Sequence, residues 1–198
     1  MISQDLLQSL VWLDYRLALL FTVFLPLVLL VWALFAKAEA ASRLLIIYWR
    51  VASLLAITVY LLMGNLPIGF LAGLAGGILI PISLWFWVDL NEEINEQPKS
   101  GFKLAFTAWR WAVSLYCMLG VLTGLPFLQC GFSQTAFTTP FCQVWLQPAI
   151  GFHSFLHARY TTGFLGFIGI AGLVIYTLYL IYFVFVRLGK QGRSAIEQ

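Results

Sequence analysis

The sequence has very little charge, and long stretches of it have none. Only 10% of the 198 residues are Asp, Glu, Lys or Arg, whereas 62% are hydrophobic. Residues 51–88, 111–152 and 160–186 contain no Asp, Glu, Lys, Arg or His at all. So few charges cannot solvate a globular surface, and the mean hydropathy of +0.92 is far above that of a soluble domain. The chain is therefore predicted to be an integral membrane protein.

The sequence also lacks the motifs of several enzyme and transporter classes. It contains no phosphate-binding glycine loop, nucleophile elbow, kinase signature or HExxH pair. Proton-coupled transporters and ion channels normally place ionisable residues at membrane depth, and the uncharged stretches argue against those classes. The net charge is +3, and the basic residues lie next to the predicted membrane spans. In that position they favour contact with the anionic headgroups of a lipid bilayer, and nucleic acid is not expected as a partner.

Five apolar segments are long enough to cross a membrane as helices, since a crossing needs about 20 residues. Backbone groups find no partners in lipid, so each continuous apolar segment must be helical. The predicted fold is all-α, a polytopic transmembrane bundle that forms a single membrane domain over residues 1–198. The predicted crossings are residues 15–36, 44–64, 66–88, 104–126 and 163–186, with an exoplasmic loop at 127–162.

The positive charges are distributed very unequally between the two sides of such a bundle. Nine of the eleven Lys and Arg residues fall on one side and the other two, Arg16 and Arg159, on the opposite side. The positive-inside rule then predicts a cytoplasmic C-terminus and an exoplasmic N-terminus. The nine residues are Lys37, Arg43, Arg50, Lys99, Lys103, Arg110, Arg187, Lys190 and Arg193.

Small residues recur at helical spacing in two of the predicted crossings. Such faces let another helix approach closely, so we expect them to pack against helices of this chain or of a partner rather than line a water-filled pore. A flat ligand such as a pigment or lipid is the alternative. The glycines concerned are Gly69, Gly73 and Gly77 in the third crossing and Gly163, Gly166, Gly169 and Gly172 in the fifth.

The predicted exoplasmic side carries the remaining candidate site residues. Cys130 and Cys142 are predicted to form a structural disulfide, because that compartment permits oxidation. Asp14 and Arg159 are predicted to form an ion pair, because unpaired charge near lipid is costly. His153 and His157 share a helix face at four-residue spacing, but a metal, haem or pigment site would need further ligands, so two ordinary histidines are favoured.

The chain resembles a family of uncharacterised integral membrane proteins from cyanobacteria, defined only as a domain of unknown function. The resemblance rests on Asp14–Tyr15–Arg16–Leu17, on Tyr48–Trp49–Arg50, on Val88–Asp89–Leu90–Asn91 and on the segment with two cysteines. It implies a thylakoid or plasma membrane in a photosynthetic cell, and it carries no activity to transfer.

Three functional hypotheses follow from the sequence. The first is a non-enzymatic accessory or assembly protein of a larger membrane complex, which the glycine faces and the aromatic content of 17% favour. The second is a small transporter or channel for an uncharged or lipidic solute. The third is a membrane enzyme, or a metal or pigment binder, that uses His153 and His157. No catalytic residue and no cofactor is assigned.

Overall fold

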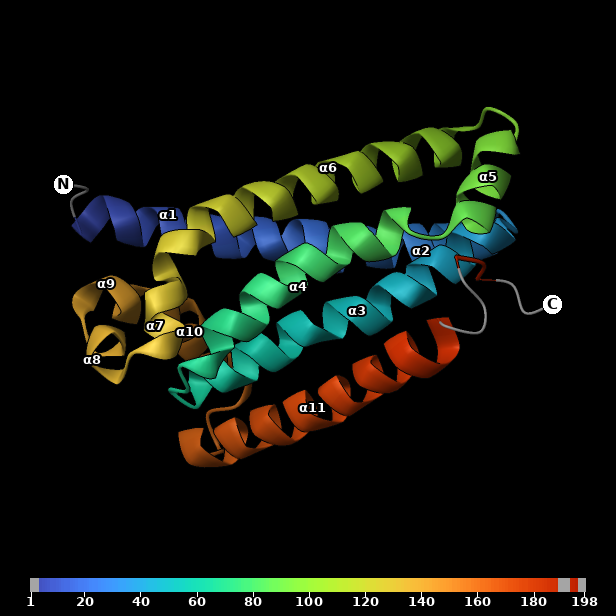
Figure 1. The fold of residues 1–198 in the computed structure, drawn as a ribbon. Helices are drawn as coiled ribbons and strands as arrows, with labels where there is room; N and C mark the ends of the chain where they lie inside the picture. Colours follow the sequence, from blue (N-terminus) through green and yellow to red (C-terminus); the bar gives the residue numbers. More distant parts are fainter. Residues whose placement is uncertain (1–3, 189–192, 196–198) are drawn as a thin grey trace.

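The computed structural model describes residues 4–188 and 193–195, and the described residues contain helices and no strands (Figure 1). Five helices or continuous helical runs are long and apolar enough to cross a membrane: Gln4–Phe35, Glu39–Met63, Ile68–Trp85, Gly101–Phe132 and Thr162–Leu188. The predicted all-α bundle with five crossings is confirmed. Lys190, counted above among the positive charges, lies outside the described residues.

The first and fifth spans each combine an α-helix with a π-helical stretch. The first consists of α1 (Gln4–Ala18), η1 (Leu19–Phe24) and α2 (Leu25–Phe35), and the fifth of α11 (Thr162–Tyr182) and η4 (Phe183–Leu188). The other long helices are α3 (Glu39–Met63), α4 (Ile68–Trp85) and α6 (Gly101–Gly124), and the short helix α5 (Val88–Glu96) lies between α4 and α6.

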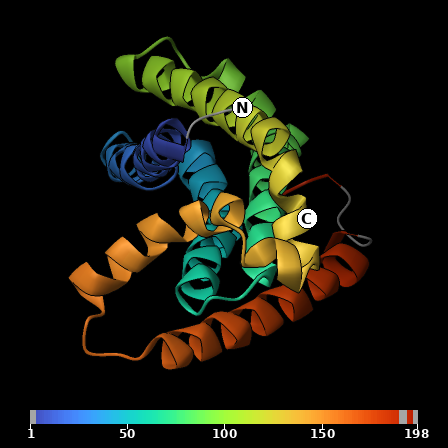
Figure 2. The same cartoon turned by 90° about the vertical axis from the view of Figure 1, so that its left-hand side faces the viewer.

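Helix α3 lies at the centre of the bundle. It packs against α4 on one side and α11 on the other, and it also contacts α2, α5 and α10. Helix α6 completes the bundle by packing against α4 and α2. Figure 2, viewed along the bundle, shows α11 at the edge of the assembly, beside α3 and remote from α6.

A proline explains how the first span is held in the bundle. Pro26 has no N–H, so the carbonyl of Thr22 loses its helical donor, and the Tyr48 hydroxyl of α3 donates to that carbonyl at 2.7 Å instead. In the wider π-turn the N–H of Leu25 bonds to Leu20, which leaves the carbonyl of Phe21 for Trp109 Nε1 of α6 at 2.9 Å. Two aromatic side chains thus satisfy the two carbonyls that the irregular turn frees.

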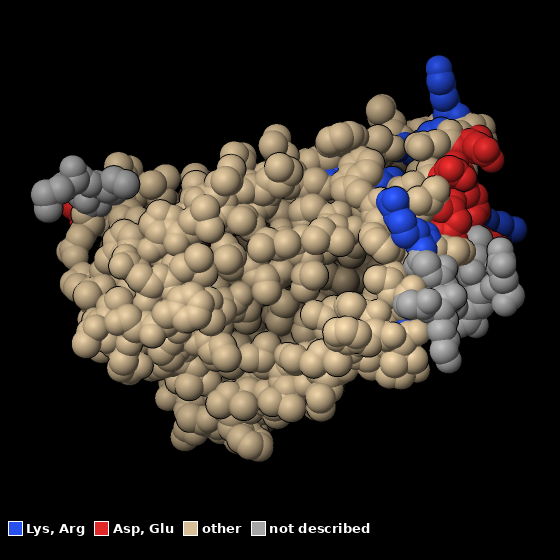
Figure 3. All heavy atoms as spheres, in the orientation of Figure 1, with Lys and Arg blue, Asp and Glu red and all other residues tan. Residues whose placement is uncertain are grey.

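Most charged side chains visible in Figure 3 gather at one end of the bundle, called here the charged end. It comprises the α2–α3 turn, the connection from α4 through α5 to α6, and the end of η4. This placement agrees with the unequal charge distribution in the sequence, whereas the membrane side that this end faces stays a prediction.

Arg110 of α6 fixes the corner where α4 ends and α5 begins. Its side chain is only 3% exposed, and it donates to the carbonyl of Leu84 at 3.0 Å and to the Asn91 side-chain oxygen. The guanidinium also lies 4.1 Å from the centre of the Trp85 ring. A cation at a helix C-terminus is favoured by the helix dipole, so Arg110 stabilises the end of α4.

The predicted loop at 127–162 is largely helical. The short helices η2 (Leu125–Phe127) and α7 (Leu128–Phe132), which end the fourth long run, lead into it, and they are followed by α8 (Gln134–Phe137), α9 (Pro140–Gln143), η3 (Val144–Leu146) and α10 (Gln147–Leu156). Pro140 and Pro148 each sit in the first turn of one of them, where a missing N–H costs nothing. We call this part of the molecule the short-helix end.

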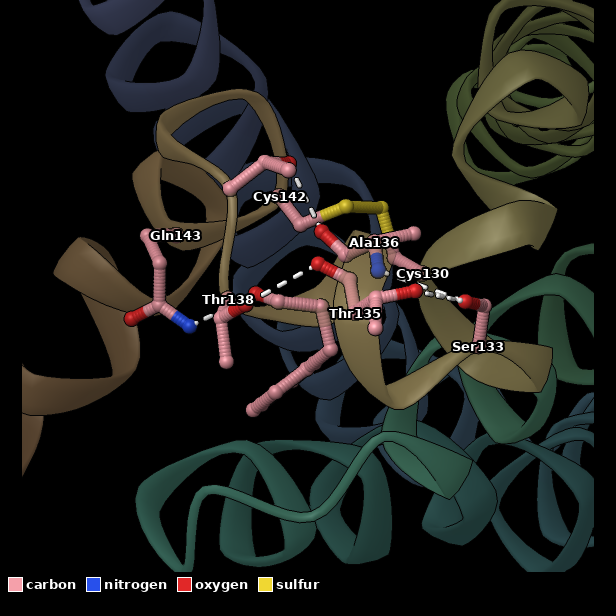
Figure 4. The surroundings of a disulfide bond; sticks show 9 residues. Cys130, Ser133, Thr135, Ala136, Thr138, Cys142 and Gln143 are labelled. Atoms are coloured by element: carbon pink, nitrogen blue, oxygen red, sulfur yellow. Dashed lines mark hydrogen bonds between the residues drawn. A yellow bond between two sulfur atoms is a disulfide. The ribbon is translucent and has the colours of Figure 1, made fainter.

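Cys130 of α7 and Cys142 of α9 form a disulfide within the short-helix end (Figure 4). Their Cα atoms are 5.8 Å apart, and both residues are fully buried. Hydrogen bonds hold the intervening chain: Ser133 caps α8 by accepting from the N–H of Ala136, and Gln143 donates to the carbonyl of Phe137 at 2.8 Å. The disulfide therefore closes a segment that is already compact.

We expect alkylation of the denatured, non-reduced protein to label one thiol per chain, that of Cys117, because the other two cysteines are bonded to each other. After reduction all three should be labelled, as intact-protein mass spectrometry would show. Labelling of all three thiols without reductant would contradict the disulfide.

The glycines of α11 allow very close packing against α3. A Cβ on Gly169 would lie 2.9 Å from the backbone nitrogen of Leu61, and one on Gly166 would lie 3.0 Å from Gly64 Cα. Gly172 faces Ile57 at 3.3 Å, whereas a Cβ on Gly163 would meet nothing within 4 Å. Two of the four glycines in this predicted packing face thus contact α3, and a third, Gly166, contacts Gly64 directly after the end of α3.

The glycines of α4 divide between two neighbouring helices. A Cβ on Gly69 would lie 2.7 Å from Leu62, and one on Gly73 would lie 3.2 Å from Thr58; both neighbours belong to α3. A Cβ on Gly77 would instead lie 3.0 Å from Val121 of α6. Each step of four residues turns about 40° past a full helical turn, so the face drifts about 80° from Gly69 to Gly77. That drift carries Gly77 to a different partner helix.

Candidate functional site

A cavity of about 250 Å³ lies between the first span, α3, α4 and α6. The short helices η3 and α10 contribute residues to its wall, and so do the glycines at 69, 73 and 77. Most of the wall is apolar. Because small residues on α4 leave space that larger side chains would fill, the same glycines that permit helix contact also shape this cavity.

Asp14 of α1 supplies the one carboxylate among the described residues that line the cavity. The hydroxyl of Tyr116 on α6 donates to its side-chain oxygen at 2.8 Å and lies 3.1 Å from its backbone oxygen. This contact joins α1 to α6 across the cavity. An ionisable side chain inside a membrane-spanning segment is costly, and such residues commonly mark a functional site.

The structure does not form the predicted ion pair between Asp14 and Arg159. Among the described residues the ion pair present joins Glu39 and Arg43, and the partner of Asp14 is Tyr116. The prediction placed Asp14 just before the first crossing, at an interface. The first helix actually begins at Gln4, ten residues before Asp14, so Asp14 lies inside the span and faces the bundle.

Trp145 of η3 gives the cavity a second polar feature. It lines the cavity, and its buried Nε1 has no hydrogen-bond acceptor within the described part of the chain. By contrast, the hydroxyls of Thr22 and Thr58 donate to carbonyls of their own helices, at 2.7 Å and 2.8 Å. The wall therefore combines a carboxylate on one side, an unpaired donor on another and apolar surface between them.

The two histidines do not form a common site. His153 Nε2 is 2.9 Å from the carbonyl of Tyr160, and His157 Nε2 is 3.1 Å from the hydroxyl of Tyr60 on α3. Helix α10 ends at Leu156, so His157 lies past its last turn. Among the described residues no group of three His, Cys, Asp or Glu side chains could hold a metal ion. The geometry of His157 is that of a contact anchoring the α10–α11 connection on α3.

Sequence reasoning missed the cavity residues Tyr116 and Trp145. Tyr116 lies in an apolar crossing and forms its key contact with a residue 102 positions away, which no local pattern reveals. The sequence does place Asp14 directly before 22 mostly apolar positions, but the first crossing was predicted to begin after it, at residue 15.

The comparisons with known proteins concern the family only. No curated protein matches the chain, and no solved structure does. A family model described as "Protein of unknown function (DUF3177)" matches residues 8–196, which is nearly the whole chain. The chain therefore belongs to the DUF3177 family, whose members are described as proteins of unknown function.

Proposed function

We propose that this protein binds a small, uncharged amphiphile in the Asp14 cavity and carries it, or presents it, within the membrane. The observation behind the proposal is the combination of a mostly apolar wall with the Asp14–Tyr116 pair and the unpaired N–H of Trp145. Ligand sites typically combine apolar walls with a few well-placed polar groups. A ligand hydroxyl or carbonyl would accept from Trp145, or a ligand hydroxyl would donate to the Asp14 carboxylate, while the apolar body of the ligand fills the remaining space.

The glycine contacts make this proposal preferable to the accessory-protein hypothesis. That hypothesis drew in part on glycine faces that a partner could cover, but Gly69, Gly73, Gly169 and Gly172 contact helix α3 of the same chain, and Gly166 contacts Gly64 directly after it. The volume of about 250 Å³ is just below the usual range of ligand pockets, about 300–1,000 Å³, and suits a small amphiphile or one end of a lipid.

Filling the cavity tests the proposal. A Cβ on Gly120, which lines the cavity, meets nothing within 4 Å, so Gly120→Leu adds bulk without a clash at Cβ. We expect wild type purified in mild detergent to retain an amphiphile that mass spectrometry detects after solvent extraction, and Gly120→Leu to lose most of it. Gly163→Leu, which also adds bulk at an open position outside the cavity, should retain it.

Equal retention by wild type and a folded Gly120→Leu variant would contradict the proposal. Equal unfolding temperatures of the variants would show that loss of ligand is not loss of fold. Flux of the extracted amphiphile in vesicles, present with wild type and absent with Gly120→Leu, would then distinguish a carrier from a binding subunit.

An accessory role in a membrane complex, in a thylakoid or plasma membrane, is our second proposal. Helix α10 supports it, because this helix lies outside the five spans yet exposes 85% of Phe155 and 56% of Leu156. Exposed apolar groups outside a membrane core favour a partner or a lipid surface. Co-migration with a large complex on a native gel, lost in Phe155→Ser, would support this role; migration as a free monomer would oppose it.

A further inference from the structure

A second hollow, separate from the Asp14 cavity, opens near the charged end. It has a volume of about 340 Å³ and is bounded by α3, α4, α11 and η4. Figure 3 shows this face of the bundle hollowed close to the charged end, in the region where Figure 1 places these helices. The hollow shares no lining residue with the Asp14 cavity, so we treat it as an independent groove.

Among the described residues, three arginines line this groove and no carboxylate does. Arg43 and Arg50 come from α3, two helical turns apart and so on nearly the same face, and Arg187 comes from η4. Arg43 lies 3.6 Å from Glu39, in an exposed pair that weakens its charge only slightly. Arg50 is exposed, and its guanidinium has no partner among the described residues. The described residues at the mouth of the groove therefore carry a net positive charge.

Beyond the arginines the groove becomes apolar. Its wall includes Ile47, Val51, Leu79 and Leu180, which lie toward the membrane interior from the charged end. Trp87 also lines the groove; it is only 6% exposed, and its buried Nε1 has no acceptor within the described part of the chain. An unpaired buried donor costs free energy unless a ligand satisfies it.

We propose that this groove binds an anionic phospholipid. The phosphate would lie between the guanidinium groups, because each guanidinium is positively charged and can donate several hydrogen bonds to phosphate oxygens. One acyl chain of the lipid would lie along the apolar wall. Trp87 would donate to an oxygen of the headgroup or ester region. The positive charge of the arginines favours an anionic lipid over a neutral one. The apolar wall of the groove favours a lipid over free phosphate, because only a lipid has an acyl chain to cover it.

The test compares lipids of identical acyl chains in detergent with the full-length protein. Phosphatidylglycerol should raise the unfolding temperature and give a bound adduct in native mass spectrometry, more strongly than phosphatidylcholine. Arg50→Gln should weaken phosphatidylglycerol binding about fivefold, since each cation near the headgroup is worth about 1 kcal/mol. Lys99→Gln, which removes one exposed charge from the same end but outside the groove, should leave binding unchanged.

Several results would overturn the proposal. Equal binding of the two lipids would show that the arginines do not select the headgroup. An equal loss of phosphatidylglycerol binding in Arg50→Gln and Lys99→Gln would show that general charge attraction, and not the groove, holds the lipid. Inorganic phosphate that binds as well as phosphatidylglycerol would identify a soluble anion, not a lipid, as the ligand. The unfolding temperatures of both variants without added lipid show whether each is folded. Because the groove shares no residue with the Asp14 cavity, failure here leaves the proposed amphiphile site untouched.

Discussion

Gly169→Ala should lower the free energy of unfolding by about 1–3 kcal/mol, the usual cost of overpacking a well-filled interface. The new methyl group would lie 2.9 Å from the backbone nitrogen of Leu61 and 3.1 Å from the backbone carbon of Tyr60. Neither atom is the end of a flexible side chain, so α11 itself must move away from α3. Gly169→Leu should cost more and detach α11 from the bundle.

Gly163→Ala is the matched control, because it makes the same change on the same helix at a position where Cβ meets nothing within 4 Å. Its stability in a detergent unfolding titration should differ from wild type by less than about 0.5 kcal/mol. If the two substitutions have equal effects, helix propensity is responsible for them, and the close α3–α11 contact described here does not contribute to stability.

Tyr48→Phe should also destabilise the protein, by about 1–3 kcal/mol, because it removes the donor to a buried carbonyl without changing the shape of the ring. Tyr48 is fully buried, and Pro26 leaves the Thr22 carbonyl with no backbone donor. No water is available in the membrane interior to replace the lost hydroxyl.

Tyr176→Phe provides the comparison for this second prediction. The Tyr176 hydroxyl lies 3.4 Å from the carbonyl of Val51, in the middle of α3, where the helix already supplies a backbone donor. The same unfolding titration should show a small effect for Tyr176→Phe. A Tyr48→Phe variant as stable as Tyr176→Phe would mean that the Thr22 carbonyl does not depend on Tyr48.

The crossings could be predicted from sequence because a membrane imposes a simple length and polarity requirement on each helix. The third crossing was predicted at 66–88, and α4 occupies Ile68–Trp85 within it. The first was predicted from residue 15 because Asp14 was taken as a boundary. Hydropathy alone cannot tell an acid at an interface from an acid that faces a protein partner, here Tyr116.

The candidate site was much less accessible to sequence reasoning. The glycines at 69, 73 and 77 were recognised as a small-residue face, but whether such a face is filled or hollow depends on how closely the neighbouring helices approach. The short-helix end is another example, because its helices are too brief for a periodic pattern to appear. Its disulfide was predictable, since two cysteines in one segment need only a short closure.

The attachment of the first span to Tyr48 and Trp109 has a consequence for the order of assembly. Residues 4–35 are translated before α3 and α6, which carry the partners of their two freed carbonyls. Until Trp109 has been synthesised, the carbonyl of Phe21 has no final donor, and translation supplies only about 5–20 residues per second. We therefore expect the first span to reach its final position only several seconds after its own synthesis, once the fourth span with Trp109 has been made.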